Sequence, residues 1–441
     1  MKTVVSLLLV VTAALADAGL VTGATRPDLR GSVLSAANQP LENASIFIYT
    51  AGPRTGVGTY CPSCYADCRK SARSGKDGTF RIESLDPGLI FRVLVTAPGF
   101  EPKIVDKVDP TNGTIQATLK RQNLDRLGTR NKLTGRVLGP KGEPIEGAKV
   151  EFHWIEEGRR GCGGVCDEWG VQPLAVTDEN GAFTLTAKHA FDRMSISVEA
   201  RALARSKFLK LPSAETHTLR MTEGADIKGR VMREGKPVPN SIVGLVSVDR
   251  SDLFTGEYEI AADEEGGYFF ANIPPGQAYY VYTRMKNAPT NGGVARTVKF
   301  NAGTDETITR VEDLVIASAL RITGRVMLAD DEPITAGSRM WLGREDAWDS
   351  LADIDVPSDG SFRLEGVPPE LVTFGARVRG YRLSEDNPNI DRLNPFRLMG
   401  RVSTNMDGFI ILLQPGESLR SSDFKDRTQP RDKPLRSAPA P

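Results

Sequence analysis

The residues of this sequence best suited to chemistry are its five cysteines, which form two groups. Cys61, Cys64 and Cys68 make a Cys-x-x-Cys-x-x-x-Cys motif, and Cys162 and Cys166 make the second group. Thiolates at these spacings can hold a zinc ion or exchange between thiol and disulfide. A zinc site with four cysteine ligands would require the two groups to meet in space.

Disulfides that staple a local loop are the alternative, and we expect them if the protein is exported. Cys162 is the natural partner of Cys166, because only three residues separate them. Cys68 pairs with Cys61 or Cys64 in this interpretation, which leaves one thiol over. The odd count keeps a metal or redox site open as a second hypothesis.

Aromatic side chains lie in or beside the same two stretches and in one later stretch. The candidates for ligand contact are Tyr60, Tyr65, Trp154, Trp169 and Trp348. Such flat rings can bind sugars when they are exposed at one end of a domain, where loops carry function. The alternative is that they cover the ends of hydrophobic cores, which we favour for Trp341.

Catalytic motifs are missing from the sequence. The three histidines, His153, His189 and His217, are far apart, whereas a zinc peptidase needs two close ligands and a third histidine downstream. There is no Gly-x-Ser-x-Gly motif, and no glycine-rich stretch continues into the Lys-Ser or Lys-Thr of a phosphate-binding loop. We therefore expect a protein that is not an enzyme and uses no cofactor.

Composition predicts an all-β protein of several domains. The 441 residues exceed what one hydrophobic core usually serves, and 43 glycines with 28 prolines are a high proportion of turn formers. Lysine and arginine number 56, as do aspartate and glutamate. Bulk charge therefore gives no reason to expect nucleic-acid binding.

Three short patterns recur in the same order along the chain. A Leu/Ile-x-Gly-x-Val segment has its glycine at positions 31, 135, 229 and 324. The second pattern is Gly-x-Phe, at Gly78-Thr79-Phe80, Gly181-Ala182-Phe183, Gly267-Tyr268-Phe269 and Gly360-Ser361-Phe362. The third is a proline turn, at Asp86-Pro87-Gly88, Pro274-Pro275-Gly276 and Pro368-Pro369-Glu370. Alternation in the first pattern indicates a half-buried strand, and we expect each Phe of the second to enter a core.

The repeats predict four Greek-key β-sandwich domains in tandem. The expected segments are residues 26–120, 132–222, 225–318 and 320–420, followed by a disordered tail over 421–441 that is rich in proline and charge. The spacing of turns leaves room for short strands in two packed sheets and none for crossover helices. Short connectors predict a semi-rigid rod.

The first 18 residues are typical of a secretory signal peptide. Lys2 precedes an apolar run over residues 4–14, and Ala16-Asp17-Ala18 fits the small-residue pattern at a cleavage site. The run is too short to span a bilayer, and no later segment is long and apolar enough. We expect an exported protein without a membrane span, either secreted or held in the periplasm or cell envelope.

The repeated patterns resemble the carboxypeptidase regulatory-like domain of secreted bacterial proteins. The segments that carry the resemblance are the glycine-centred strand, residues 177–183 (Thr-Asp-Glu-Asn-Gly-Ala-Phe) and the Pro274-Pro275-Gly276 turn. The resemblance covers residues 27–420, although the second unit lacks the Pro-Gly turn and Glu370 stands where the family has glycine. It implies a transthyretin-like (prealbumin-like) sandwich, grouped with Cna-B-type modules in the carbohydrate-binding-like fold. It does not imply peptidase activity.

These observations favour an exported, non-enzymatic adhesion, binding or spacer protein. The expected ligand is a carbohydrate or a protein of the cell envelope or extracellular space, contacted through the inserts. A second hypothesis is a metal-binding or redox accessory protein that acts through the cysteine inserts. A third is a regulatory partner of a separately encoded hydrolase.

Overall fold

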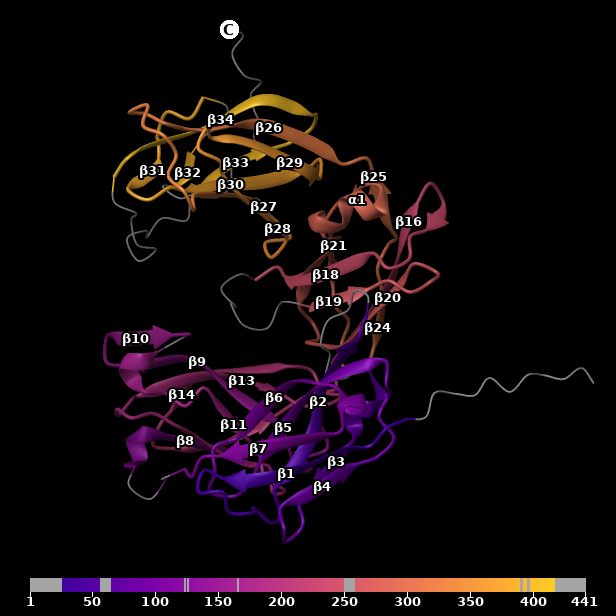
Figure 1. The fold of residues 1–441 in the computed structure, drawn as a ribbon, viewed down its shortest axis with the longest axis vertical. Coiled ribbons are helices and arrows are strands. Elements are labelled where there is room, and N and C mark those ends of the chain that lie inside the picture. The colour runs from indigo at the N-terminus through magenta and orange to yellow at the C-terminus, as the bar shows by residue number, and fades with distance from the viewer. Residues whose placement is uncertain are drawn as a thin grey trace, which may run out of the picture.

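The computed structural model describes residues 26–55, 65–122, 124, 127–164, 166–249, 258–388, 392–394 and 397–416. Strands dominate this part of the chain, and its one α-helix is the single turn α1 (Ala288–Asn291). The strands form eight sheets, two in each of four successive units (Figure 1). The prediction of an all-β chain of tandem β-sandwiches is confirmed. Within the described ranges, no helix has the length and hydropathy needed to cross a bilayer.

Unit 1 sets out the plan that the later units vary. Its first sheet has the order β4-β1-β7, with β1 antiparallel to β4 and parallel to β7, and its second has the order β3-β2-β5-β6. One hydrophobic cluster fills the space between these sheets. The strands are β1 (Leu29–Ser35), β2 (Ser45–Pro53), β3 (Ser71–Arg73), β4 (Thr79–Ile82), β5 (Leu89–Thr96), β6 (Lys103–Val108) and β7 (Thr114–Leu119).

Unit 2 repeats this plan around its own core. Its sheets are β12-β8-β15 and β10-β9-β13-β14, and β11 also pairs with β9. The strands are β8 (Lys132–Leu138), β9 (Lys149–Glu157), β10 (Arg160–Gly163), β11 (Leu174–Val176), β12 (Ala182–Thr186), β13 (Arg193–Glu199), β14 (Ser206–Pro212) and β15 (Thr216–Arg220).

Units 3 and 4 each have two sheets around a hydrophobic cluster. Unit 3 comprises β16 (Ala225–Arg233), β17 (Lys236–Pro237), β18 (Ile242–Ser247), β19 (Tyr258–Ala261), β20 (Gly267–Ile273), β21 (Ala278–Thr283), β22 (Val294–Ala295), β23 (Val298–Asn301), β24 (Ile308–Arg310) and β25 (Leu314–Ala317). Unit 4 comprises β26 (Leu320–Leu328), β27 (Arg339–Arg344), β28 (Leu351–Asp355), β29 (Ser361–Val367), β30 (Leu371–Arg377), β31 (Tyr381–Leu383), β32 (Arg392–Asn394), β33 (Arg397–Arg401) and β34 (Met406–Pro415).

The recurring glycine of the first strand makes room for an aromatic ring of the neighbouring strand. Gly31 lies opposite Phe80, and a Cβ at Gly31 would come within 2.7 Å of that ring. Gly135 and Phe183 repeat the arrangement in unit 2. The glycine pattern therefore reports close packing between strand backbone and core ring.

In unit 3 the prediction that Phe269 enters the core is wrong by one residue, because Tyr268 enters the core instead. The turn before β20 has Gly266 at φ +70°, where the other units have a glycine at +72° to +75°. Tyr268 consequently takes the core position opposite Gly229, and Phe269 points outward with 44% of its surface exposed. The cause is the turn, in which Asp263 accepts two backbone hydrogen bonds and Gly266 supplies the left-handed residue. Strand alternation then sets which side chains face the core.

The four units do not form the predicted rod. Units 1 and 2 lie side by side (Figure 1), and β2 is buried on both faces from Ser45 to Gly52. In unit 3, β18 is buried along its whole length, and its Val246 packs with Ala347 and Trp348 of unit 4. A strand with two apolar faces must be covered on both sides. We call the two resulting contacts seam 1–2 and seam 3–4.

Candidate functional site

An exposed tryptophan lies flat on the β9–β10 hairpin of unit 2. Trp154 on β9 faces Gly163 on β10, and 43% of its surface is exposed. A Cβ on Gly161 would come within 2.6 Å of Trp154 Cζ2, and one on Gly163 within 2.7 Å of Cε3. The ring therefore rests across both glycines. One face of the ring is supported by backbone, and the side chain remains half open to solvent.

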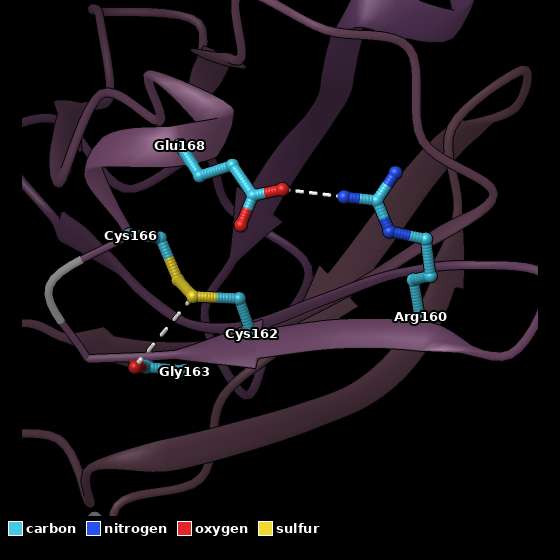
Figure 2. Close-up of a disulfide and its surroundings, with 5 residues drawn as sticks. All are labelled: Arg160, Cys162, Gly163, Cys166 and Glu168. Carbon is cyan, nitrogen blue, oxygen red and sulfur yellow. Dashed lines mark hydrogen bonds and ion pairs between the residues drawn. A yellow bond between two sulfur atoms is a disulfide. The ribbon is translucent and has the colours of Figure 1, made fainter.

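A disulfide fixes the strand beneath this ring. Cys162, between the two glycines, is bonded to Cys166 with a Cα–Cα distance of 6.1 Å (Figure 2). Cys166 is buried, and both sulfur-bearing residues pack in the core of unit 2. The predicted pairing is confirmed. Because Cys162 is anchored in the core, β10 is held in place under Trp154.

The rest of the hairpin insert closes the same end of the core. Trp169 is buried, and the Arg160 guanidinium lies 5.9 Å from the centre of its ring. Arg160 also forms an ion pair with Glu168 (Figure 2). Trp169 therefore covers the end of the core, which is the alternative to ligand contact given above for these aromatic residues. Its ring is not exposed for contact with a ligand.

The other predicted ligand residues do not gather around Trp154. Tyr60 lies outside the described residues. Tyr65 is half-buried against the core of unit 1. Trp348 packs in seam 3–4, where its Nε1 donates a hydrogen bond to the Ser247 carbonyl at 3.1 Å. Of the candidates in the described part of the chain, Trp154 alone has the exposure of a binding platform.

Cys68 of unit 1 and Cys162 of unit 2 lie near opposite ends of strand β9. Cys61 and Cys64 fall outside the described residues, whereas Cys68 is buried and its carbonyl accepts a hydrogen bond from Arg201 at 3.0 Å. Arg201 follows the end of β13 that pairs with Lys149, and Cys162 pairs with Ile155, six residues along β9. Six residues of strand span roughly 20 Å. Cys68 and Cys162 therefore do not meet.

Titratable groups give little support to metal or redox chemistry in the described ranges. No group of three or more His, Cys, Asp or Glu residues there is placed to hold a metal ion. Burial raises the pKa of Cys68 to about 11, which disfavours the thiolate. Burial also lowers the pKa of His153 to about 4, so its imidazole is neutral at pH 7. Cys61 and Cys64 lie outside the described residues, so a metal or redox site that involves these two cysteines stays a prediction.

Seam 1–2 buries a charged group that the sequence analysis did not identify. Glu199, at the end of β13, contacts Arg205 at 2.8 Å and Lys149 at 3.2 Å. Burial alone would raise the pKa of Glu199, but these two cations outweigh it and lower the pKa to about 2. Lys149 Nζ also lies 5.1 Å from the centre of the Tyr49 ring of unit 1. Tyr258 of unit 3 is near this group, and burial raises its pKa to about 12.

An open cleft of about 660 Å³ runs beside the same seam. Arg73 of unit 1 bridges to Glu146 of unit 2 at 2.8 Å, and Gln122 Nε2 donates to Gln172 Oε1 at 2.5 Å. Phe100 adds an aromatic wall. The uninterrupted apolar run over residues 46–49 is the sequence signal for a strand covered on both faces, and it could have pointed to this seam.

Of three comparisons with known proteins, only the comparison with solved structures found similar chains. The sequence matches no protein-family model and no curated protein. Among solved structures, the chain is similar to the Bacillus anthracis TIE protein, with 11% identity, TM-score 0.18, and coverage of 85% of this chain and 68% of that one. It is similar to a streptococcal ancillary pilin, with 10% identity, TM-score 0.23, and coverage of 66% and 99%.

A third similar structure is a pair of B repeat units from the collagen-binding protein of Staphylococcus aureus. Here the identity is 12%, the TM-score is 0.18, and the coverage is 88% of this chain and 98% of that one. Identities and TM-scores this low say nothing about what the present chain binds.

Proposed function

We propose that this chain is an exported, non-enzymatic binding protein in which Trp154 contacts a sugar ring. The observation that carries the proposal is the flat placement of Trp154 over Gly161 and Gly163, with 43% of its surface exposed. The C–H groups of a pyranose ring can pack on the negative face of an indole, and a rigid backing reduces the entropy lost on binding. The Cys162–Cys166 disulfide supplies that backing.

Three further features support the wider proposal. The segment over residues 1–18 is typical of a signal peptide, so we propose a secreted, periplasmic or cell-envelope location. The recurring strand and turn patterns support membership of the carboxypeptidase regulatory-like family. Four sandwiches in tandem also suit a spacer role. A protein of the extracellular space is the alternative ligand for the same platform.

A glycan array probed with the full mature chain tests this proposal. We expect the wild-type protein to bind at least one class of glycan on the array, and we expect Trp154→Ala to show no binding to that class. Gly163→Ala should weaken retention as well, because its methyl group would displace the ring. Leu351→Ala is a matched control, since it removes an exposed apolar side chain in unit 4. Retention by Trp154→Ala equal to that of the wild type, or no retention by the wild type, would refute carbohydrate binding at this platform.

A further inference from the structure

The open cleft beside seam 1–2 has walls from two units and from the chain that joins them. Unit 1 contributes the β5–β6 turn with Phe100, unit 2 contributes strand β12 with Thr184, and Gln122 comes from the connecting segment. Its volume of about 660 Å³ falls within the ~300–1,000 Å³ of ligand sites, which occur preferentially at domain interfaces. No residue of the β9–β10 hairpin lines it, so the cleft is a site apart from the Trp154 platform.

Two glutamine side chains meet in the wall of this cleft and keep hydrogen-bonding atoms open. Gln122 Nε2 donates to Gln172 Oε1 at 2.5 Å, and the same oxygen accepts from Thr186 Oγ1 at 3.1 Å. The backbone N–H of Gln122 bonds the Gly99 carbonyl, and that of Gln172 bonds the Thr186 carbonyl, so both glutamines are held in place. Gln122 Oε1 and Gln172 Nε2 have no partner in the described part of the chain. One acceptor and one donor therefore remain for a ligand.

The edge strand β12 adds open backbone groups to the same wall. β12 is the outer strand of the β12-β8-β15 sheet, and alternate residues of an antiparallel strand bond its neighbour. Val137 of β8 bonds the Gly181 carbonyl, so the N–H and C=O groups of Thr184 point away from β8, and they form no hydrogen bond within the described ranges. The other two outward residues, Ala182 and Thr186, already bond groups of unit 2.

The charges that line the cleft are engaged with one another or with their own turn. Arg73 contacts Glu146 at 2.8 Å and Glu179 at 3.6 Å. Asp178, the third carboxylate of the lining, accepts hydrogen bonds from two backbone N–H groups of its own turn at 2.9 and 2.8 Å. The groups that remain open for a ligand are therefore amides, a hydroxyl and backbone, all of them uncharged.

The charged residues that border this lining restore a neutral balance. The lining itself has one cation and three carboxylates, and its described border adds four cations and two carboxylates, which gives five of each sign. The border residues, which adjoin the lining in sequence, across β8 or through an electrostatic contact with Glu146, are Glu42, Glu101, Lys103, Arg121, Arg136 and Arg201. The cleft consequently selects for neither an anion nor a cation.

We propose that this cleft binds a neutral oligosaccharide. Its hydroxyl groups would bond the open amide atoms of Gln122 and Gln172 and the backbone of Thr184, and one sugar ring would lie against Phe100. A charged ligand gains little from a lining whose charges are compensated. A polypeptide strand would require several open backbone groups in alternation, and β12 offers one such residue. An apolar ligand would leave the amides without partners.

Isothermal titration calorimetry of the full mature chain with neutral hexasaccharides tests this proposal. The probes are hexamers of glucose, xylose, mannose and N-acetylglucosamine, and all variants are made in a Trp154→Ala background so that the platform does not contribute. We expect at least one probe to bind. Gln122→Ala/Gln172→Ala should weaken it by about tenfold, because hydrogen bonds from two amides are lost. Thr184→Tyr should abolish binding, because it places a bulky uncharged ring in the cleft wall.

Two matched controls make the same chemical changes outside the cleft. Gln116→Ala/Gln277→Ala removes two exposed amides that do not line it. Thr216→Tyr places the same ring on β15, at the opposite edge of the sheet and in the same row as Thr184. Both controls should bind like the Trp154→Ala parent, and this pattern supports the cleft whether or not the platform binds a glycan.

Four results would overturn the proposal. The first is failure of every hexasaccharide to bind the Trp154→Ala protein, which leaves the test of the platform untouched. The second is an equal loss in the cleft variants and their controls. The third is displacement of the saccharide by an uncharged Ser/Thr hexapeptide of equal affinity, which would favour a polypeptide ligand. The fourth is tighter binding of a hexauronate than of any neutral probe, which would favour an anion.

Discussion

Seam 1–2 and seam 3–4 join neighbouring sandwiches in physically different ways. In seam 1–2 the buried carboxylate Glu199 finds its cations, Arg205 and Lys149, within its own unit. Unit 1 adds mainly an apolar cluster of Phe47, Tyr49 and Leu94. The charge of this seam is thus satisfied before the two units meet. Apolar area supplies most of the contact across this seam. The polar contacts across it, such as Arg201 to the Cys68 carbonyl at 3.0 Å and Arg73 to Glu146 at 2.8 Å, are only partly buried and constrain the angle between the units less.

In seam 3–4 a buried guanidinium crosses from one unit to the other. Arg344 of unit 4 has no exposed side-chain surface and binds Glu370 of its own unit at 2.5 Å. Its other donors reach the carbonyls of Thr283 at 2.7 Å and Ala295 at 2.9 Å in unit 3. Met285 of unit 3 also enters the core of unit 4. The fork of the guanidinium must match fixed backbone atoms, so this seam permits one orientation.

The comparison teaches that a buried charge contributes to domain orientation only when its partners lie across the seam. We therefore expect units 3 and 4 to behave as one cooperative body, and units 1 and 2 to separate more readily. Four measurements would break or sharpen this comparison.

The largest effect is expected for Arg344→Ala. This change leaves Glu370 and two backbone carbonyls without their donor in a buried site, at about 3–5 kcal/mol of unfolding free energy. Denaturant unfolding followed by circular dichroism should show an earlier transition for units 3 and 4. Arg339→Ala on the same strand is the control, because its ion pair with Asp353 is half exposed and should contribute under about 1 kcal/mol. Equal effects of the two changes would contradict the comparison.

Acid should destabilise unit 2 through Glu199, because both cations of this carboxylate belong to the same unit. The folded-state pKa of about 2 lies below the usual value of 4.5 for a glutamate, so the ionised carboxylate stabilises the fold above about pH 4.5. That contribution, about 3 kcal/mol, is lost as the pH falls towards 2. Glu199→Gln should be less stable than the wild type at pH 7 and equally stable near pH 2, as measured by thermal unfolding across this range. A constant difference at all pH values would contradict the assignment.

Removal of the Cys162–Cys166 disulfide should affect unit 2 and leave both seams intact. Closing a loop this short contributes about 2 kcal/mol, so Cys162→Ser/Cys166→Ser should lower the stability of unit 2 by that amount. Trp154 should become more mobile, which tryptophan fluorescence anisotropy would detect. Small-angle scattering of the variant should match the wild type, and a change in overall dimensions would show that the hairpin does support a seam.

The smallest effect is expected for Arg73→Ala at the rim of seam 1–2. Arg73 and Glu146 are 48% and 36% exposed, so their ion pair should contribute less than about 1 kcal/mol. Equilibrium unfolding in low and high salt measures it. A loss as large as that of Arg344→Ala would mean that the two seams do not differ in the way described.

Much of the local structure was predictable from the sequence because the signals are local. The spacing of Cys162 and Cys166 allowed one short closure, and the disulfide is present. The recurring glycine indicated a place where a ring packs on backbone, as Gly31 and Phe80 show. Phe269 was predicted wrongly because two adjacent glycines precede it. The pattern could not tell which of them takes the left-handed turn position.

The candidate sites were less predictable, because exposure depends on what packs against each side chain. Five aromatic residues had similar sequence surroundings, yet Trp169 covers a core, Trp348 lies in a seam and Trp154 faces solvent.

The sequence by itself determined that this chain builds a series of β-sandwiches, because turn residues, alternating apolar positions and glycine–ring contacts act within a few tens of residues. Only the tertiary structure decided which outer faces meet. That choice depends on surfaces made of several strands, such as β2 against unit 2 and β18 against unit 4. No single stretch of sequence contains such a surface, since its residues become neighbours only after each sandwich has closed.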